Sequence, residues 1–312
     1  MNHVYHTPVL CQELTEAIVA NSPKLVVDAT LGGGGHARAV LEKAGIETVL
    51  VGLDQDEEAL TEAAKTLAAY GERVKILSEN FRDLADRLAD LGIKKADAIY
   101  ADLGVSSHQI DSPERGFSYL HDGPLDMRMN QTSKITAADL LRDLSAGELT
   151  NIFHEYGEER FAKKIARRIE KERERRQLQH ASQLVEIVEA CVPFKMRIKS
   201  LSRIFQALRI AVNDELAALN EFLAASHALL APYGLLAVIS YHSLEDRQVK
   251  SFFRQKEKGC VCPPELPVCM CGRTSELSVL TRKPIQPGDD ELSRNPRARS
   301  ARLRIARKRG GN

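Results

Sequence analysis

The residues with the clearest chemical potential form one short run, Asp28–His36, in which an acidic side chain precedes four consecutive glycines. The apolar segment Leu25–Val27 leads into the run and predicts a strand that ends at the acidic residue. Glycines permit a tight turn with positive φ and let a ligand approach the backbone closely. A helix that begins just after such a loop offers free N–H groups. The pattern Gly32-x-Gly34-x-x-Ala37 also fits the dinucleotide fingerprint, so the run indicates a nucleotide-type cofactor without fixing which one.

A second acidic residue narrows the choice of cofactor. The segment Thr48–Leu53 predicts another strand, and Asp54 follows it about 20 residues after the glycines, where a carboxylate can accept hydrogen bonds from both ribose hydroxyls. NAD and S-adenosylmethionine share that ribose. Asp28 favours S-adenosylmethionine, because a carboxylate there would repel a pyrophosphate and attract the positive sulfonium and ammonium groups. The plain structural alternative is a glycine-rich turn with two solvated carboxylates.

The order of the predicted elements indicates an α/β fold. Strands alternate with helical segments, which predicts a parallel sheet, and the early strands are 25–29, 48–53, 73–77 and 97–103. The next strand, 235–241, comes about 130 residues later, although a parallel crossover needs only about a dozen. We therefore predict a helical insertion over residues 109–205 between two parts of one domain, residues 1–108 and 206–312. We predict that residues 202–230 form the helix that returns to the sheet. The later predicted elements are a helix at 245–256 and strands at 277–282 and 301–306.

Positive charge gathers in two segments, although the net charge is only +1. Residues 160–176 hold nine Lys or Arg against three Glu, and residues 294–309 hold eight with no acidic residue. Both segments are candidate nucleic-acid surfaces. The first is equally well explained as the solvated face of a helix with an apolar residue at every fourth position. In the second, apolar residues alternate with Arg302 and Arg304, which predicts a half-buried strand with a wholly basic outer face.

Composition sets broad limits on the class of protein. A chain of 312 residues exceeds the usual size of one domain, and its 43% hydrophobic and 28% charged residues are typical of a globular protein. The amino-terminal residues lack the pattern of a signal peptide, and no apolar run is long enough to span a bilayer. We therefore expect a cytoplasmic protein that does not enter a membrane, and its oligomeric state is left open.

Four of the six cysteines form two closely spaced pairs in a proline-rich segment, Cys260 with Cys262 and Cys269 with Cys271. Four thiolates could hold a tetrahedral zinc ion, but one intervening residue is fewer than the usual two to four. A permanent disulfide is disfavoured in the cytosol. The sequence leaves a structural zinc site open and gives no reason to expect a catalytic metal.

Several short segments, taken in order, resemble the motifs of one enzyme family. They are His6–Leu10, Asp28–His36, Asp102–Ser107, Arg115–Ser118, Asp122–Met129, Tyr156–Arg160, His242–Arg247 and Asn295–Ser300. Together they resemble the bacterial 16S rRNA (cytosine-N4)-methyltransferase family of the RsmH/MraW type, over nearly the whole chain.

The resemblance implies a Rossmann-like S-adenosylmethionine-dependent methyltransferase fold with an inserted all-helical domain that recognises RNA. It implies S-adenosylmethionine as methyl donor and a cytidine in the decoding region of 16S rRNA, in the small ribosomal subunit, as acceptor. The cofactor contacts that it suggests are Gly34, Gly35, His36, Asp54, Phe81, Asp102 and Gln109.

Two residues are candidates for the reaction itself. Asp102 would accept a hydrogen bond from the cytosine amino group, and His242, after the fifth strand, would help to hold the base. Each ligand assignment has a structural alternative: Phe81 in the core, His36 capping its helix, Gln109 in a surface loop and His242 shaping a loop.

Other activities fit parts of the same pattern. The main alternative is a methyltransferase that acts on another RNA or on DNA cytosine, although DNA amino-methyltransferases commonly carry a proline-rich motif after the fourth strand, where this chain has Asp102–Val105. Two other classes, an NAD-dependent oxidoreductase and a non-catalytic RNA-binding protein, do not explain Asp28 and Asp102 together. Which nucleotide is modified, whether naked rRNA or an assembled subunit is the substrate, and which group takes the proton are not fixed by the sequence.

Overall fold

The computed structural model describes residues 8–260, 262–263, 268, 270–271 and 274–310. The chain divides into two compact units. The first combines Met1–Gly104 with Ala217–Asn312, and the second is the continuous stretch Val105–Leu216.

The first unit is built on a seven-stranded sheet in the order β3-β2-β1-β4-β5-β7-β6. The strands are β1 (Leu25–Asp28), β2 (Val49–Asp54), β3 (Val74–Ser78), β4 (Ala96–Asp102), β5 (Leu230–Ser240), β6 (Leu277–Val279) and β7 (Arg302–Lys308). Strands β1 to β5 pair in parallel, whereas β7 runs antiparallel to both β5 and β6. The predicted α/β class and the parallel sheet are confirmed, and the predicted last strand joins the sheet in the antiparallel direction.

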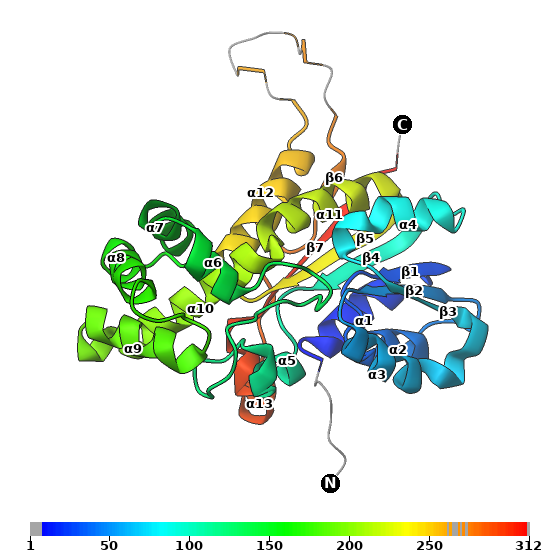
Figure 1. The fold of residues 1–312 in the computed structure, drawn as a ribbon. Coiled ribbons are helices and arrows are strands. Elements are labelled where there is room, and N and C mark those ends of the chain that lie inside the picture. Colours follow the sequence, from blue (N-terminus) through cyan, green and yellow to red (C-terminus); the bar gives the residue numbers. More distant parts are fainter. Residues whose placement is uncertain (1–7, 261, 264–267, 269, 272–273, 311–312) are drawn as a thin grey trace. The chain divides into compact units, whose positions relative to one another are not determined.

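Helices cover both faces of this sheet because its strands are apolar on both sides (Figure 1). In β1, Val26 packs in one core with helices α1, α2 and α3, and Val27 packs in the other core with α4, α11 and α12. Continuous apolar strands of this kind are typical of a parallel sheet buried on both faces. The six helices are α1 (Cys11–Val19), α2 (Gly35–Lys43), α3 (Glu57–Leu67), α4 (Leu84–Asp90), α11 (Glu215–Leu229) and α12 (Ser243–Glu257).

The second unit consists of helices around its own core. They are α5 (Ser107–Asp111), α6 (Ala137–Asp143), α7 (Ala146–Glu155), α8 (Ala162–Arg173), α9 (Ala181–Cys191) and α10 (Arg197–Asn213). Buried Phe153, Ile165 and Leu184 bring α7, α8 and α9 into that core. The capping box at the start of α7 is present, since Ser145 and Glu148 exchange hydrogen bonds.

One expectation about the second unit was wrong. The single helix predicted over 202–230 is two helices, because Asp214 lies between α10 and α11 in the left-handed conformation with φ 49°. Aspartate tolerates that conformation better than most residues and so can end a helix there. The predicted boundary at residue 205 falls inside α10, which belongs entirely to the second unit.

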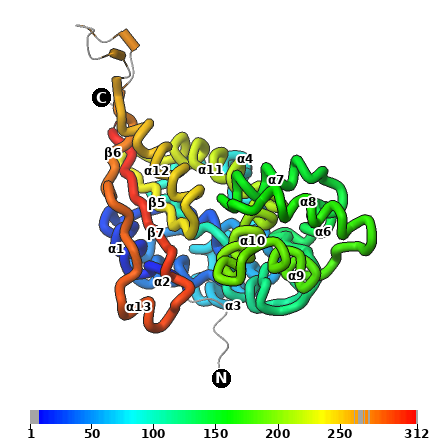
Figure 2. Tube along the Cα trace, turned by 90° about the vertical axis from the view of Figure 1, so that its left-hand side faces the viewer, coloured from blue at the N-terminus to red at the C-terminus, as the bar shows by residue number. Residues whose placement is uncertain are grey.

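The last strand also corrects an expectation. Strand β7 lies between β5 and β6 (Figure 2), and Leu303 and Ile305 pack into one core as the alternation predicted. Its basic face is not a solvated surface, because α12 supplies Asp246 to it. Arg304 is 5% exposed and forms a bidentate ion pair with Asp246 at 2.6 and 3.2 Å. Arg302 contacts the same carboxylate at 3.1 Å but keeps 41% of its side chain exposed.

A further expectation concerned membranes. No helix in the part of the chain that the structure describes is long and apolar enough to cross a bilayer.

Candidate active site

Three acidic residues meet at one edge of the sheet in the first unit. The strand order reverses direction between β1 and β4, and open α/β sheets bind ligands outside the carboxyl ends of the strands at such a point. Asp28, Asp54 and Asp102 are the last residues of β1, β2 and β4. The fold therefore brings together carboxylates that are far apart in the sequence.

The glycine run connects β1 to α2 and needs glycine for two reasons. Gly32 and Gly34 have φ of 52° and 80°, a backbone region that other residues rarely adopt. Neighbouring side chains also leave little room for a Cβ. A Cβ on Gly34 would lie 3.2 Å from Leu67, and one on Gly35 would lie 3.3 Å from Pro8. The Cβ of Gly34 would thus press on α3, and the loop keeps its tight course because of packing as well as turn geometry.

Asp54 fastens this loop to the end of β2. Its Oδ2 accepts a hydrogen bond from the Gly32 N–H at 2.7 Å, and its Oδ1 accepts one from the Asp56 N–H at 2.9 Å. Burial raises the pKa of Asp54 to about 6, and these backbone hydrogen bonds oppose the rise. The backbone N–H of Gln55 adds a third hydrogen bond to this carboxylate. A carboxylate can accept about four hydrogen bonds, so it retains acceptor capacity for a ligand.

Asp102 lies at the centre of a hydrogen-bonded group. Its Oδ1 accepts a hydrogen bond from the Tyr241 hydroxyl at 2.9 Å, and its backbone N–H donates to Thr30 Oγ1 at 2.6 Å. Its side chain is 9% exposed. The pKa of Tyr241 is raised well above its ordinary value by burial and by the Asp102 charge, so the tyrosine stays protonated and acts as a donor.

His36 presents an acceptor to the same carboxylate. Its Nε2 lies 2.9 Å from the Val9 carbonyl oxygen, which can only accept, so Nε2 carries the proton. Burial lowers the pKa of His36 to about 4, and the ring is neutral near pH 7. The bare Nδ1 then lies 3.7 Å from Asp102 Oδ2. His36 does not cap its own helix, since α2 has no side-chain cap.

The environment of His36 determines how this residue changes the stability of the folded protein as the pH falls. The unfolded histidine takes up a proton near pH 6.5 and the folded one only near pH 4, so protonation favours unfolding as the pH falls through that window. His36→Gln keeps an N–H for the Val9 carbonyl and does not titrate. Relative to this variant, we expect the wild type to lose stability between pH 6.5 and 4, measured by urea unfolding at several pH values. Parallel pH profiles for the two proteins would contradict the assignment.

Asp28 is a buried support and not an open counter-charge. It is 1% exposed, and its carboxylate accepts hydrogen bonds from the Tyr100 hydroxyl at 2.8 Å and the Thr30 N–H at 3.1 Å. Burial raises the pKa of Asp28 to about 7. Because Thr30 in turn holds the backbone of Asp102, Asp28 positions that residue through one intermediate. The sequence reasoning missed Thr30 and Tyr100, and a tyrosine inside an apolar strand was the available signal.

The other candidate residues have structural partners of their own. Phe81 follows β3, is half-buried and meets Phe222 edge-on with ring centroids 5.5 Å apart. His242 is the N-cap of α12, and its Nε2 lies 3.1 Å from Glu245 Oε1. Gln109 belongs to the second unit, where its Oε1 accepts a hydrogen bond from the Ser106 N–H at 2.9 Å in the capping box of α5.

Comparison with known proteins identifies the family. The model of the MraW methylase family matches residues 3–309. This chain belongs to the MraW methylase family. It is 50% identical over 306 residues to the ribosomal RNA small subunit methyltransferase H of Syntrophotalea carbinolica, with 97% of this chain and 98% of that protein covered. It is 48% identical over 308 residues to the protein of the same name from Heliobacterium modesticaldum, with 97% and 98% covered.

A member of the MraW methylase family takes its methyl group from S-adenosylmethionine, and the residues at this edge fit that cofactor. The remaining acceptor capacity of the Asp54 carboxylate suits a ribose hydroxyl. The adjacent acceptors, His36 Nδ1 and Asp102 Oδ2 at 3.7 Å, suit a cationic or N–H group and disfavour a phosphate. The choice of S-adenosylmethionine over a dinucleotide therefore agrees with the charge of the site.

Proposed function

We propose that this methyltransferase modifies the N4 atom of one cytidine in the decoding region of 16S rRNA. The relatives at 48–50% identity are named ribosomal RNA small subunit methyltransferase H, which supports small-subunit rRNA as the substrate class. The observation that carries the chemistry is the Asp102 carboxylate, held at the end of β4 by Tyr241 and Thr30.

The acceptor atom determines what the protein must do. The lone pair of cytosine N4 is delocalised into the ring, so N4 is a weak nucleophile. The base must leave its stack and be oriented at short range. Bound S-adenosylmethionine supplies an electrophilic methyl group on a positively charged sulfur.

In this proposal, Asp102 makes cytosine N4 a better nucleophile. By accepting a hydrogen bond from an N4–H, its carboxylate localises the lone pair on nitrogen and stabilises the positive charge that develops there. The Tyr241 hydroxyl donates to Oδ1 and so holds the carboxylate in position. N4 gains the methyl group and loses one of its two protons, which passes to Asp102 or to water.

One experiment tests the assignment of substrate and atom. The enzyme is incubated with isotopically labelled S-adenosylmethionine and small ribosomal subunits that lack the modification, and the nucleosides are identified by mass spectrometry. We expect label in N4-methylcytidine from 16S rRNA. Label confined to another nucleoside, or transfer only to another RNA or to DNA cytosine, would overturn the proposal in favour of the main alternative.

Asp54 is the proposed ribose contact, and its removal has a measurable cost. Asp54→Ala should weaken S-adenosylmethionine binding by roughly 1–3 kcal/mol in calorimetry, because charge-assisted hydrogen bonds are lost. The same residue holds Gly32, so a ligand control is needed. The wild type should bind a 2′-deoxy analogue more weakly than the parent compound, and Asp54→Ala should bind the two alike. Equal preference for the ribose form in both proteins would refute the contact.

We further propose that the helical second unit binds RNA, through a stripe on α8. Lys163, Arg167 and Lys171 recur every four residues and are exposed. They make no ion pair with any residue in the described part of the chain. By contrast, Arg142 is held by Asp139 and Asp143. Unpaired cations on one helix face are suited to phosphate contacts.

Salt dependence tests this surface. Arg167→Gln should reduce the slope of log affinity for rRNA against log salt concentration by about one, the effect of losing a single phosphate contact. Arg142→Gln removes one charge from the same unit and should leave the slope unchanged. Neither should alter cofactor binding. Identical slopes for Arg167→Gln and the wild type would show that the stripe is only a solvated helix face.

A further inference from the structure

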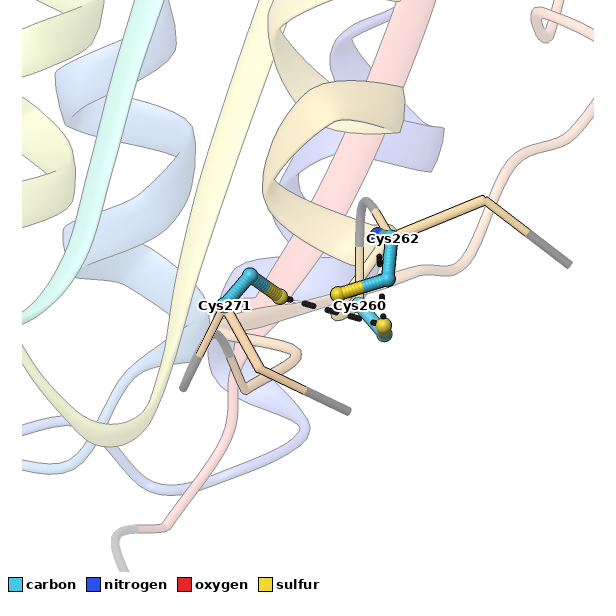
Figure 3. A group of neighbouring side chains, drawn as sticks. All are labelled: Cys260, Cys262 and Cys271. Atoms are coloured by element: carbon cyan, nitrogen blue, oxygen red, sulfur yellow. Dashed lines mark hydrogen bonds between the residues drawn. The ribbon is translucent and has the colours of Figure 1, made fainter. Parts of the chain in front are cut away.

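The connection between α12 and β6, residues 258–276, brings three cysteines together (Figure 3). The Sγ atoms of Cys260, Cys262 and Cys271 all lie within 4.8 Å of one another. Cys269 belongs to the same sequence motif and lies outside the described residues. This cluster is separate from the residues assigned to methyl transfer.

The spacing of the sulfurs matches a metal site better than a disulfide. Cys271 Sγ lies 3.8 Å from Cys260 Sγ. A disulfide would require about 2.05 Å. Two thiolates on a tetrahedral zinc ion, each with a Zn–S distance of about 2.3 Å, are separated by about 3.8 Å.

Backbone N–H groups of the same segment point at two of these sulfurs. The Cys262 N–H donates to Cys260 Sγ at 3.4 Å, and the Met270 N–H donates to Cys262 Sγ at 3.4 Å. Cysteine binds zinc through its thiolate sulfur, and a thiolate can accept such N–H hydrogen bonds.

Few interactions of the described residues hold this connection together beyond its base, so a cross-link would stabilise it. Its base is closed where the Glu276 N–H donates to the Lys256 carbonyl at 2.9 Å and the two side chains form an ion pair at 3.0 Å. Beyond the base the described residues lack a hydrophobic core, since Val268 and Met270 are 70% and 83% exposed. Long connections without regular structure are uncommon in compact proteins, and a structural metal can order a segment that buries little apolar surface.

We propose that Cys260, Cys262 and Cys271 bind one Zn²⁺ ion that fixes this connection. Soft thiolate ligands select zinc over magnesium or calcium. The ion has a structural role, and the methyl-transfer residues are not among its ligands.

Metal analysis of the whole, untagged protein tests the proposal. After expression with added zinc and purification under reducing conditions, the wild type should carry about one zinc ion per chain. The double variant Cys260→Ser/Cys262→Ser should lose it, and Cys11→Ser, which removes a thiol outside the cluster, should keep it. Zinc-free wild-type protein, or equal zinc in the double variant and the wild type, would overturn the site.

A second measurement does not depend on folding of the variants. Co²⁺ added to metal-free wild-type protein should produce the intense near-ultraviolet absorption of thiolate-to-cobalt charge transfer, and Zn²⁺ should abolish it by displacement. Absence of that absorption at saturating Co²⁺ would contradict thiolate ligation.

Discussion

Replacing Asp102 by asparagine is expected to slow methyl transfer by on the order of a hundredfold or more, as seen when one preorganised electrostatic contact to a transition state is removed. The substitution preserves the shape of the side chain but removes the charge that stabilises N4 as it becomes positive. Single-turnover rates at saturating cofactor and substrate isolate this step from binding.

Tyr241→Phe is the matched control for that experiment. It removes the hydrogen bond to Asp102 Oδ1 and leaves the carboxylate in place, so it should cost less than Asp102→Asn. Calorimetry with S-adenosylmethionine separates a catalytic loss from weaker cofactor binding. Rates near the wild type for Asp102→Asn would remove this residue from the catalytic role and leave it at most a cofactor contact.

The second large effect concerns the buried ion pair between β7 and α12. Arg304→Gln leaves Asp246 buried without its main partner, and breaking such a pair costs about 3–5 kcal/mol of unfolding free energy. Urea denaturation measures the loss. Natural domains have only about 5–15 kcal/mol of stability, so this variant should lose a substantial part of it.

Arg302→Gln tests whether burial of the ion pair causes the large loss of stability expected for Arg304→Gln. Arg302 contacts the same carboxylate from the same strand but is 41% exposed, and exposed pairs contribute about 0–1 kcal/mol. Replacing both buried partners, Arg304→Met with Asp246→Leu, should recover much of the lost stability. Equal losses for Arg304→Gln and Arg302→Gln would contradict this explanation.

The elements that depend on local sequence were predictable. The apolar runs ending at Asp28, Asp54 and Asp102 gave the strands, and the topology of parallel sheets then placed their carboxyl ends at one edge. The glycine run and the capping box at Ser145 were equally local signals.

What was missed depends on partners distant in the sequence. Alternation in 302–306 showed two faces of a strand, but not that α12 would bring Asp246 to the basic one. Asp28 meets Tyr100 only because β1 and β4 are neighbours. By contrast, Ser106-x-x-Gln109 fits the capping-box pattern and was a local signal, whereas a histidine cap such as His242 lies outside that pattern.

The insertion of the second unit between β4 and β5 has a consequence for the order of folding. These two strands pair directly, with Ala98 opposite Leu235, although the whole of residues 105–216 separates them. Loop closure over such a length is slow, because its entropy is lost before the contacts form. The continuous helical unit is free of this delay. A folding chain should therefore form the cationic stripe of α8 before the sheet edge that carries Asp102 is complete. The surface proposed to bind RNA would then exist before the site of methyl transfer.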